Sequence, residues 1–86
     1  MALPSKQSKN MQLYYYDSCP FCVKTRKAIA QSDVSVELRN IQHNNQYRLD
    51  LIEGGGKKQV PCLRIEHATD DIQWLYESND IIKFLM

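Results

Sequence analysis

The sequence contains no long apolar run and no excess of charge of either sign. A helix that spans a bilayer needs about 20 consecutive apolar residues, and no stretch of this chain approaches that length. The chain has 11 basic and 10 acidic residues and a net charge of +1. Nucleic-acid-binding domains usually carry a marked basic excess. We therefore expect neither a membrane nor a nucleic acid as a partner.

Cysteine is scarce and unevenly placed. The chain has 3 cysteines, an odd number, and two of them lie in Cys19-Pro20-Phe21-Cys22, too close together to tie distant elements. This count argues against a disulfide scaffold. Residues 1–10 lack the apolar segment of a secretory signal, so we expect a reducing, cytoplasmic location. In such a compartment a Cys-x-x-Cys motif is more often redox-active or metal-binding than a permanent bridge.

The remaining pattern predicts one α/β domain that follows a polar leader. Residues 1–10 are predicted to be a disordered leader or linker, and residues 11–86 to form the domain. Periodicity and turn residues predict strands and helices in the order βαβ followed by αββα, with strands at 12–16, 34–39, 60–65 and 72–76 and helices at 20–32, 44–53 and 78–86. A right-handed crossover and a final hairpin then give a four-stranded mixed sheet with helices on both faces.

Two helix ends carry specific signals. Asp17 and Ser18 offer oxygen acceptors for the start of the first helix, whose inner face is predicted to begin at Phe21. Gly54-Gly55-Gly56 is predicted to stop the second helix, because glycine readily takes the left-handed conformation at helix C-termini. Ser78 is predicted to cap the last helix.

The strand, turn and helix around Cys19 form the strongest chemical signal. A cysteine at a helix N-terminus is stabilised as a thiolate by free N–H groups and the helix dipole, and Lys24 and Lys27 add positive charge nearby. Cys22 lies one turn further on, placed to attack a mixed disulfide formed on Cys19. A metal site and a purely structural buried pair remain alternatives, although Cys62, His43 and His67 share no zinc-ligand spacing with the motif.

Three features together make the chain resemble the glutaredoxins, which have the thioredoxin fold. They are Cys19-Pro20-Phe21-Cys22 after the first strand, Val60-Pro61 at the third strand, and Glu77-Ser78-Asn79-Asp80 at the last helix. The resemblance implies a cis Pro61 and main-chain pairing of Val60 with the cysteine of glutathione. It also departs from many glutaredoxins, because Gln59 replaces a threonine and Leu75-Tyr76 replaces a glycine pair.

The resemblance also implies how the two ends of glutathione are held. Ser78 would bind the γ-glutamyl carboxylate at a helix N-terminus, with Glu77 or Asp80 holding its ammonium, as in the N-terminal half of glutathione transferases. Arg39, Arg48 and Lys58 are the candidates for the glycine carboxylate. Cys62, directly after Pro61, is interpreted as a buried strand cysteine, with an additional redox or glutathionylation site as the alternative.

The implied function is a monomeric, glutathione-dependent thiol–disulfide oxidoreductase that needs no metal. Its substrates would be disulfide-bonded and glutathionylated proteins, with Cys19 and Cys22 as the catalytic pair. Two alternatives remain open: a glutathione-binding module resembling the N-terminal domain of a glutathione transferase, and a carrier of an iron–sulfur cluster or metal.

Overall fold

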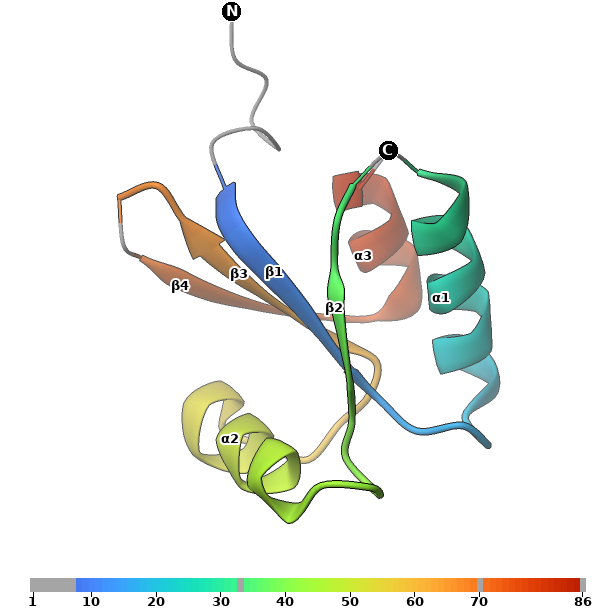
Figure 1. Cartoon of the computed structure of the whole chain (residues 1–86), viewed down its shortest axis with the longest axis vertical. Coiled ribbons are helices and arrows are strands. Elements are labelled where there is room, and N and C mark those ends of the chain that lie inside the picture. The colour runs from blue at the N-terminus through green and yellow to red at the C-terminus, as the bar shows by residue number, and fades with distance from the viewer. Residues whose placement is uncertain (1–7, 33, 70, 86) are drawn as a thin grey trace, which may run out of the picture.

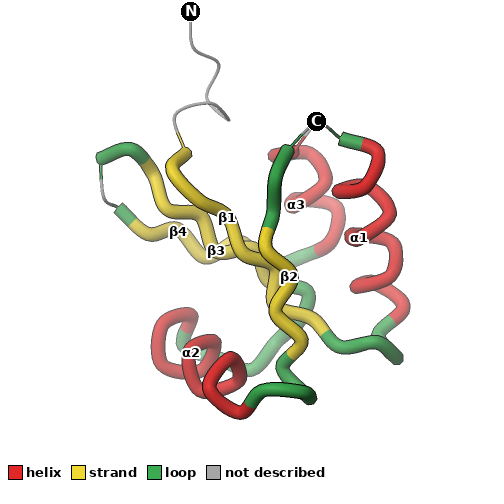
Figure 2. Tube along the Cα trace, viewed as in Figure 1, coloured by secondary structure: helices red, strands yellow, loops and turns green. Residues whose placement is uncertain are grey.

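A computed structural model describes residues 8–32, 34–69 and 71–85 of the chain. Within these residues the elements follow the predicted order (Figures 1 and 2). They are β1 (Ser8–Tyr15), α1 (Pro20–Gln31), β2 (Glu37–Asn40), α2 (Asn45–Gly55), β3 (Cys62–His67), β4 (Ile72–Tyr76) and α3 (Ser78–Leu85).

The four strands form one mixed sheet in the order β2-β1-β3-β4. β1 and β2 pair in parallel, while β1 with β3 and β3 with β4 pair antiparallel. α1 and α3 lie side by side on one face of the sheet, and α2 lies on the other face (Figure 1). The predicted thioredoxin-like α/β fold is confirmed. None of the described helices is long and apolar enough to cross a membrane.

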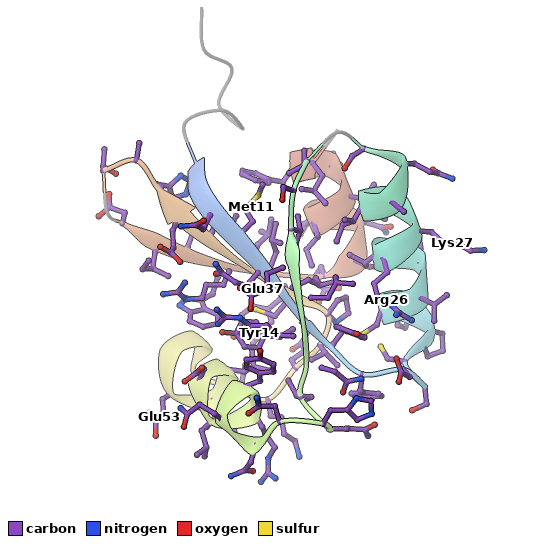
Figure 3. The ribbon with its side chains drawn as sticks, viewed as in Figure 1. Met11, Tyr14, Arg26, Lys27, Glu37 and Glu53 are labelled. Carbon is purple, nitrogen blue, oxygen red and sulfur yellow. The ribbon has the colours of Figure 1, made fainter. Side chains whose placement is uncertain are left out.

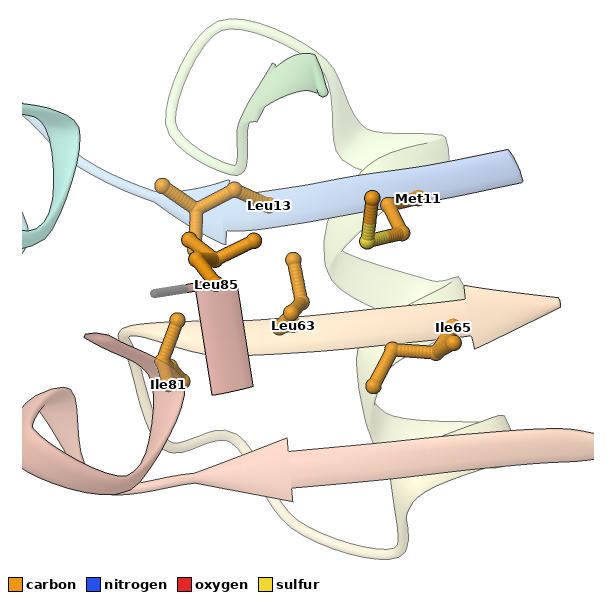
Figure 4. Close-up of a cluster of buried hydrophobic side chains, with 6 residues drawn as sticks. All are labelled: Met11, Leu13, Leu63, Ile65, Ile81 and Leu85. Carbon is orange, nitrogen blue, oxygen red and sulfur yellow. The ribbon is translucent and has the colours of Figure 1, made fainter. Parts of the chain in front are cut away.

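Alternation along the central strands builds a core on each face. On the face covered by α1 and α3, six buried side chains form one cluster (Figure 4): Met11, Leu13, Leu63, Ile65, Ile81 and Leu85. The opposite face meets α2 through a second cluster of Tyr14, Ile41, Leu51 and Cys62. Tyr14 lies between the sheet and α2 (Figure 3). Apolar contacts therefore cover both faces of the sheet. Residues that take part in chemistry are then expected at the ends of the strands.

Two strand boundaries differ from the prediction. β1 begins at Ser8 rather than at residue 11 or 12, because Ser8 already pairs with His67 of β3. Residues 1–7, the rest of the predicted leader, lie outside the described residues. β2 begins only at Glu37, and Leu38 is 45% exposed. Val34 and Val36 pack against the first core cluster from the segment before the strand, where they need no ladder pairing.

The glycine run ends α2 through a left-handed glycine, as predicted, but it does so at its last residue, Gly56, rather than directly after residue 53. α2 begins after Asn44, whose side chain accepts from the Gln46 N–H at 2.9 Å, and it continues through Gly55. Of the three glycines, only Gly56 has positive φ, at 89°, and its N–H donates to the Ile52 carbonyl at 3.0 Å. Gly54 and Gly55 are helical, so their presence has another cause than helix termination.

Candidate functional site

Cys19 is the residue that starts α1. Its N–H donates to the carbonyl of Tyr16, the residue directly after β1 (3.3 Å), and its carbonyl accepts the Val23 N–H (3.0 Å). Its Sγ accepts the N–H of Cys22 at 3.2 Å, so the cysteine is its own helix cap. Pro20 occupies the first turn, where the missing N–H costs nothing. The predicted helix N-terminal position of Cys19 is confirmed.

Two predictions about this turn are wrong. The caps expected from Asp17 and Ser18 are not used, because the Cys19 sulfur takes that place; Asp17 instead approaches Arg26 of α1 at 3.9 Å. Phe21 was expected on the inner face of the helix but is 62% exposed. The inner face begins one residue later, at Cys22, and Phe21 is the exposed residue within the motif.

The two sulfurs of the motif differ in environment. Cys22 is fully buried, and burial, followed by the neighbouring Cys19 sulfur, raises the pKa of Cys22 to about 12. Cys19 is 6% exposed, less open than the sequence led us to expect, because its sulfur turns back over the helix end to meet the Cys22 N–H. Of the pair, only Cys19 has any surface that a substrate can reach.

A lysine of α1 links the motif to the start of α3. The Lys24 ammonium donates to Asn79 Oδ1 at 2.9 Å. Lys27 lies further along the outer side of α1 (Figure 3). The Lys24 ammonium therefore helps to hold the N-terminus of α3 against α1, and the predicted effect of Lys24 and Lys27 on the Cys19 sulfur stays a prediction.

The Val60–Pro61 peptide bond is cis, as the resemblance implied. Val60 lines a cavity of about 850 Å³ together with Tyr16, the residue whose carbonyl receives the Cys19 N–H. This shared cavity places Val60 beside the turn that carries Cys19. The other lining residues are Ile41, Gln42, Asn45, Arg48, Lys58 and Gln59.

The start of α3 lies at the same end of the molecule. Gln59 Nε2 donates to Glu77 Oε2 at 3.4 Å, which joins the cavity wall to the residue before the helix. Glu77 takes the left-handed conformation (φ 72°), and its carbonyl accepts the Ile81 N–H at 3.0 Å. Glu77 therefore precedes the helix, while Ser78, predicted as the cap, is its buried first residue. Asp80, in the first turn, is exposed.

The structure distinguishes between the three basic residues considered for the glycine carboxylate of glutathione. Arg48 and Lys58 both line the cavity beside Val60. Arg39 does not: its guanidinium donates to the Tyr14 hydroxyl at 2.7 Å and to Glu37 at 3.3 Å, facing a second cavity of about 540 Å³. Arg39 is thus no candidate for this site.

Sequence reasoning missed Tyr16 as a lining residue, and it missed the three that follow β2, namely Ile41, Gln42 and Asn45. A signal for them existed in the parallel pairing of β1 and β2. Tyr15 and Asn40 are partners at the carboxyl ends of those strands, and segments that leave such ends lie next to one another. The loop after Asn40 must therefore come close to the turn after Tyr15.

Cys62 lies apart from this chemistry. It is fully buried in the second core cluster, and burial raises the pKa of its thiol to about 12. Its position fits the interpretation as a buried strand cysteine. Across residues 8–32, 34–69 and 71–85, no group of three or more histidine, cysteine or acidic side chains is arranged to hold a metal ion.

Comparison with known families now places the chain. The family model of the glutathione S-transferase N-terminal domain matches residues 13–86, which is most of the sequence. The chain belongs to the glutathione S-transferase N-terminal domain family. Within this family its Cys19-Pro20-Phe21-Cys22 motif gives it the glutaredoxin character that the sequence already suggested.

Individual proteins that are similar to this chain agree with its assignment to that family. It is similar to Glutaredoxin 2 of Escherichia coli strain K12, with 33% identity over 75 residues, 87% of this chain but 32% of that protein. The chain thus spans about a third of the length of the curated relatives it matches. A maleylacetoacetate isomerase from Anaeromyxobacter dehalogenans with bound glutathione has a similar fold (TM-score 0.68, 23% identity, 92% of this chain, 37% of that one). Wheat glutaredoxin does too (TM-score 0.66, 21% identity, 91% and 72%).

Proposed function

We propose that this chain is a glutathione-dependent thiol–disulfide oxidoreductase in which Cys19 is the attacking thiol and Cys22 the resolving one. The observation that supports this most is the Cys19 Sγ at the head of α1, accepting the Cys22 N–H. A main-chain donor and a helix N-terminus both favour negative charge on that sulfur. The motif thus pairs a cysteine at the helix start that keeps 6% of its surface exposed with a second cysteine, a turn away, that has none.

The first reaction removes glutathione from a protein thiol. The Cys19 thiolate attacks the glutathione sulfur of the mixed disulfide, so a Cys19–glutathione disulfide forms and the protein thiolate leaves and takes up a proton. A second glutathione thiolate then attacks the glutathione sulfur on Cys19. Oxidised glutathione departs, and the Cys19 thiolate is restored.

The second reaction reduces a protein disulfide and needs both cysteines. Cys19 attacks one sulfur of the target, and the Cys22 thiol then loses its proton and attacks Cys19, releasing the reduced target. Part of what raises the pKa of Cys22 is the neighbouring Cys19 sulfur. In the mixed disulfide the Cys19 sulfur cannot be an anion, so the charge part of its effect on the Cys22 pKa is absent while the effect of burial remains. Two molecules of glutathione then reduce the Cys19–Cys22 disulfide.

Glutathione would lie across the cavity beside Val60, reaching to the start of α3. Main-chain groups of Val60, before Pro61, would pair with its cysteine portion. The N–H groups of the first turn of α3, from Ser78 onward, have no helical partner and suit the γ-glutamyl carboxylate. Glu77 or Asp80 would hold its ammonium. Among the described residues that line the cavity, none is acidic, and Arg48 and Lys58 supply cations for the glycine carboxylate.

Removing a cation from the cavity should weaken substrate binding rather than chemistry. We expect Arg48→Ala and Lys58→Ala each to raise KM for a glutathionylated peptide about threefold to tenfold, because each loses a charge-assisted contact with a carboxylate. kcat should change little, since neither residue lies in the motif. Steady-state kinetics of the purified variants provides the measurement.

Arg39→Ala is the matched control, because its guanidinium faces the other cavity and binds Tyr14 and Glu37. Its KM should stay near that of the wild type. Equal KM values for all three variants would contradict this position of the glycine carboxylate.

A second candidate function is a glutathione-binding module without redox activity, which the match to the transferase N-terminal family favours. A coupled assay with glutathione, glutathione reductase and a glutathionylated peptide separates the two. Glutathione-dependent turnover supports the oxidoreductase. Binding of glutathione without turnover supports the module.

The partners we propose are glutathione together with disulfide-bonded or glutathionylated proteins. Such a cycle runs toward reduction only where reduced glutathione is abundant, which agrees with a reducing, cytoplasmic compartment. We propose that the chain acts as a monomer, because the proposed mechanism uses the side chains of a single chain.

A further inference from the structure

Two glycines inside α2 are not accounted for by helix termination. Gly54 and Gly55 have helical backbones, and only Gly56 takes the left-handed conformation. Alanine is more stable than glycine inside a helix. Glycine at both positions therefore points to a close approach by another part of the molecule.

That other part is the pair of aromatic rings on β4. A β-carbon on Gly54 would overlap Cζ2 of Trp74 and lie 2.9 Å from its Cη2. A β-carbon on Gly55 would overlap the Tyr76 hydroxyl, while its distances to Cζ of Tyr76 and Cε3 of Trp74 would be 3.3 and 3.2 Å. The last turn of α2 thus lies directly on the two rings, at a separation that only glycine permits.

Tyr76 also contacts the segment that follows α2. The Lys57 ammonium lies over the Tyr76 ring, 4.5 Å from its centre. In the strand register Tyr76 is opposite Cys62, the residue after Pro61, and Glu77 follows it in the chain. Tyr76 is thus next to three parts of the chain: the end of α2, the cis-proline segment and the residue that precedes α3.

The Tyr76 hydroxyl is buried and has no nitrogen or oxygen partner within the described residues; its polar neighbour is the Cys62 thiol, a weak hydrogen-bonding group. Burial, followed by the nearby Cys62 thiol, raises the pKa of Tyr76 to about 12. A buried hydroxyl whose only polar neighbour is a thiol is unusual. Here the hydroxyl fills the space left by the missing side chain of Gly55, which makes the fit between Gly55 and Tyr76 specific.

These contacts determine the spacing of the cavity walls. α2 carries Asn45 and Arg48, and the segment after it carries Lys58, Gln59 and Val60; all five line the larger cavity, which Tyr16 also lines. The last turn of α2 and Lys57 connect these two sets of lining residues along the chain, and both contact Tyr76. A change in the height of α2 over β4 would therefore move Arg48 relative to Val60.

We propose that Gly55 and Tyr76 form a positioning pair that sets the geometry of the glutathione site. The inference rests on the proposed function and adds to it residues that touch neither glutathione nor the reacting sulfurs. They act through Arg48, Lys58 and Val60. Neither residue enters the chemistry, so their disturbance should change KM for a glutathionylated peptide much more than kcat.

The test is a double-mutant cycle on the intact chain. Gly55→Ala should raise KM for the peptide about tenfold, since displacements of about an ångström in a binding site have effects of this size or larger. In the Tyr76→Phe background the same change should raise KM less than about threefold, because the atom that the new methyl group overlaps is gone. kcat should change by less than about threefold throughout.

A matched control and two physical readouts accompany the cycle. Glu53→Ala, an exposed change in the same turn of α2 that faces the second cavity, should leave KM unchanged. The rate of Cys19 alkylation should be the same in all variants. Trp74 is the only tryptophan, so its emission should shift in Gly55→Ala and return toward the wild type in the double variant.

Each outcome decides the proposal. A wild-type KM in Gly55→Ala, or an equal increase in both backgrounds, contradicts the positioning pair while the proposed function stands. Absence of turnover by the wild-type chain contradicts the proposed function itself. Should Gly55→Ala alone fail to fold, the double variant must fold and bind the peptide normally; its failure to fold would overturn the pairing.

Discussion

Cys19→Ser should abolish reduction of both glutathionylated and disulfide-bonded substrates, lowering turnover by at least about a thousandfold. Serine is isosteric but has no thiolate, and thiol exchange proceeds only through attack by a thiolate. Of the two sulfurs in the motif, Cys22 cannot replace it: it is fully buried, and burial raises its pKa to about 12. The coupled glutathione reductase assay measures this loss.

Cys22→Ser is the matched variant and should divide the two reactions. Removal of glutathione from a peptide should continue at a rate within about threefold of the wild type, since the second glutathione resolves the intermediate. Reduction of a protein disulfide that needs Cys22 should fall by at least about a hundredfold. Full turnover by Cys19→Ser, or equal loss of both reactions in Cys22→Ser, would be incompatible with the roles proposed for the pair.

Alkylation should distinguish the three thiols almost completely at neutral pH. A thiol with a pKa of about 12 is ionised at pH 7 to a fraction on the order of 10⁻⁵, and the Cys22 and Cys62 thiols both have this value. Of the three cysteines, only Cys19 keeps any exposed surface, at 6%, and its sulfur accepts a main-chain N–H. Iodoacetamide should therefore modify Cys19 at least about a hundred times faster than either of the others.

The two fully buried thiols, Cys22 and Cys62, make the stability of the folded chain depend on pH, because the pKa of each is raised. Cys22 and Cys62 hold their protons more firmly in the folded chain than in the unfolded one. They therefore contribute stability that is present below about pH 9 and is lost as the pH rises toward 12.

Peptide mapping after alkylation at pH 7 and pH 9.5, with a denatured control that labels all three cysteines, compares how fast each of the three is labelled. Rapid labelling of Cys62 in the folded chain at pH 7 would show that this cysteine is accessible and ionised.

The sequence predicted the fold well because its signals were local and periodic. Alternation in β1 put Leu13 on one face and Tyr14 on the other, as the two core clusters confirm. The Cys19-Pro20 start of α1 was also readable, because proline suits a first turn. That Cys19 would cap its own helix was not readable, since Asp17 and Ser18 offered better acceptors by residue type.

The failures concern residues whose role depends on a distant part of the chain. Gly54 and Gly55 looked like a helix stop because their contacts with Trp74 and Tyr76 join segments about 20 positions apart. Arg39 could not be separated from Arg48 as a carboxylate ligand, because only the tertiary structure shows that Arg39 binds the Tyr14 hydroxyl. Local pattern fixes where elements form; it does not tell which side chains meet between them.

The central claim is that one sulfur, at the head of α1, receives glutathione. Its most direct test is to incubate the Cys22→Ser variant with a glutathionylated peptide, quench with acid and locate the adduct by tandem mass spectrometry. We expect a single glutathione in disulfide linkage to Cys19, formed without modification of Cys62. Glutathione found on Cys62, or an unmodified Cys19 after the peptide has been consumed, would contradict the claim.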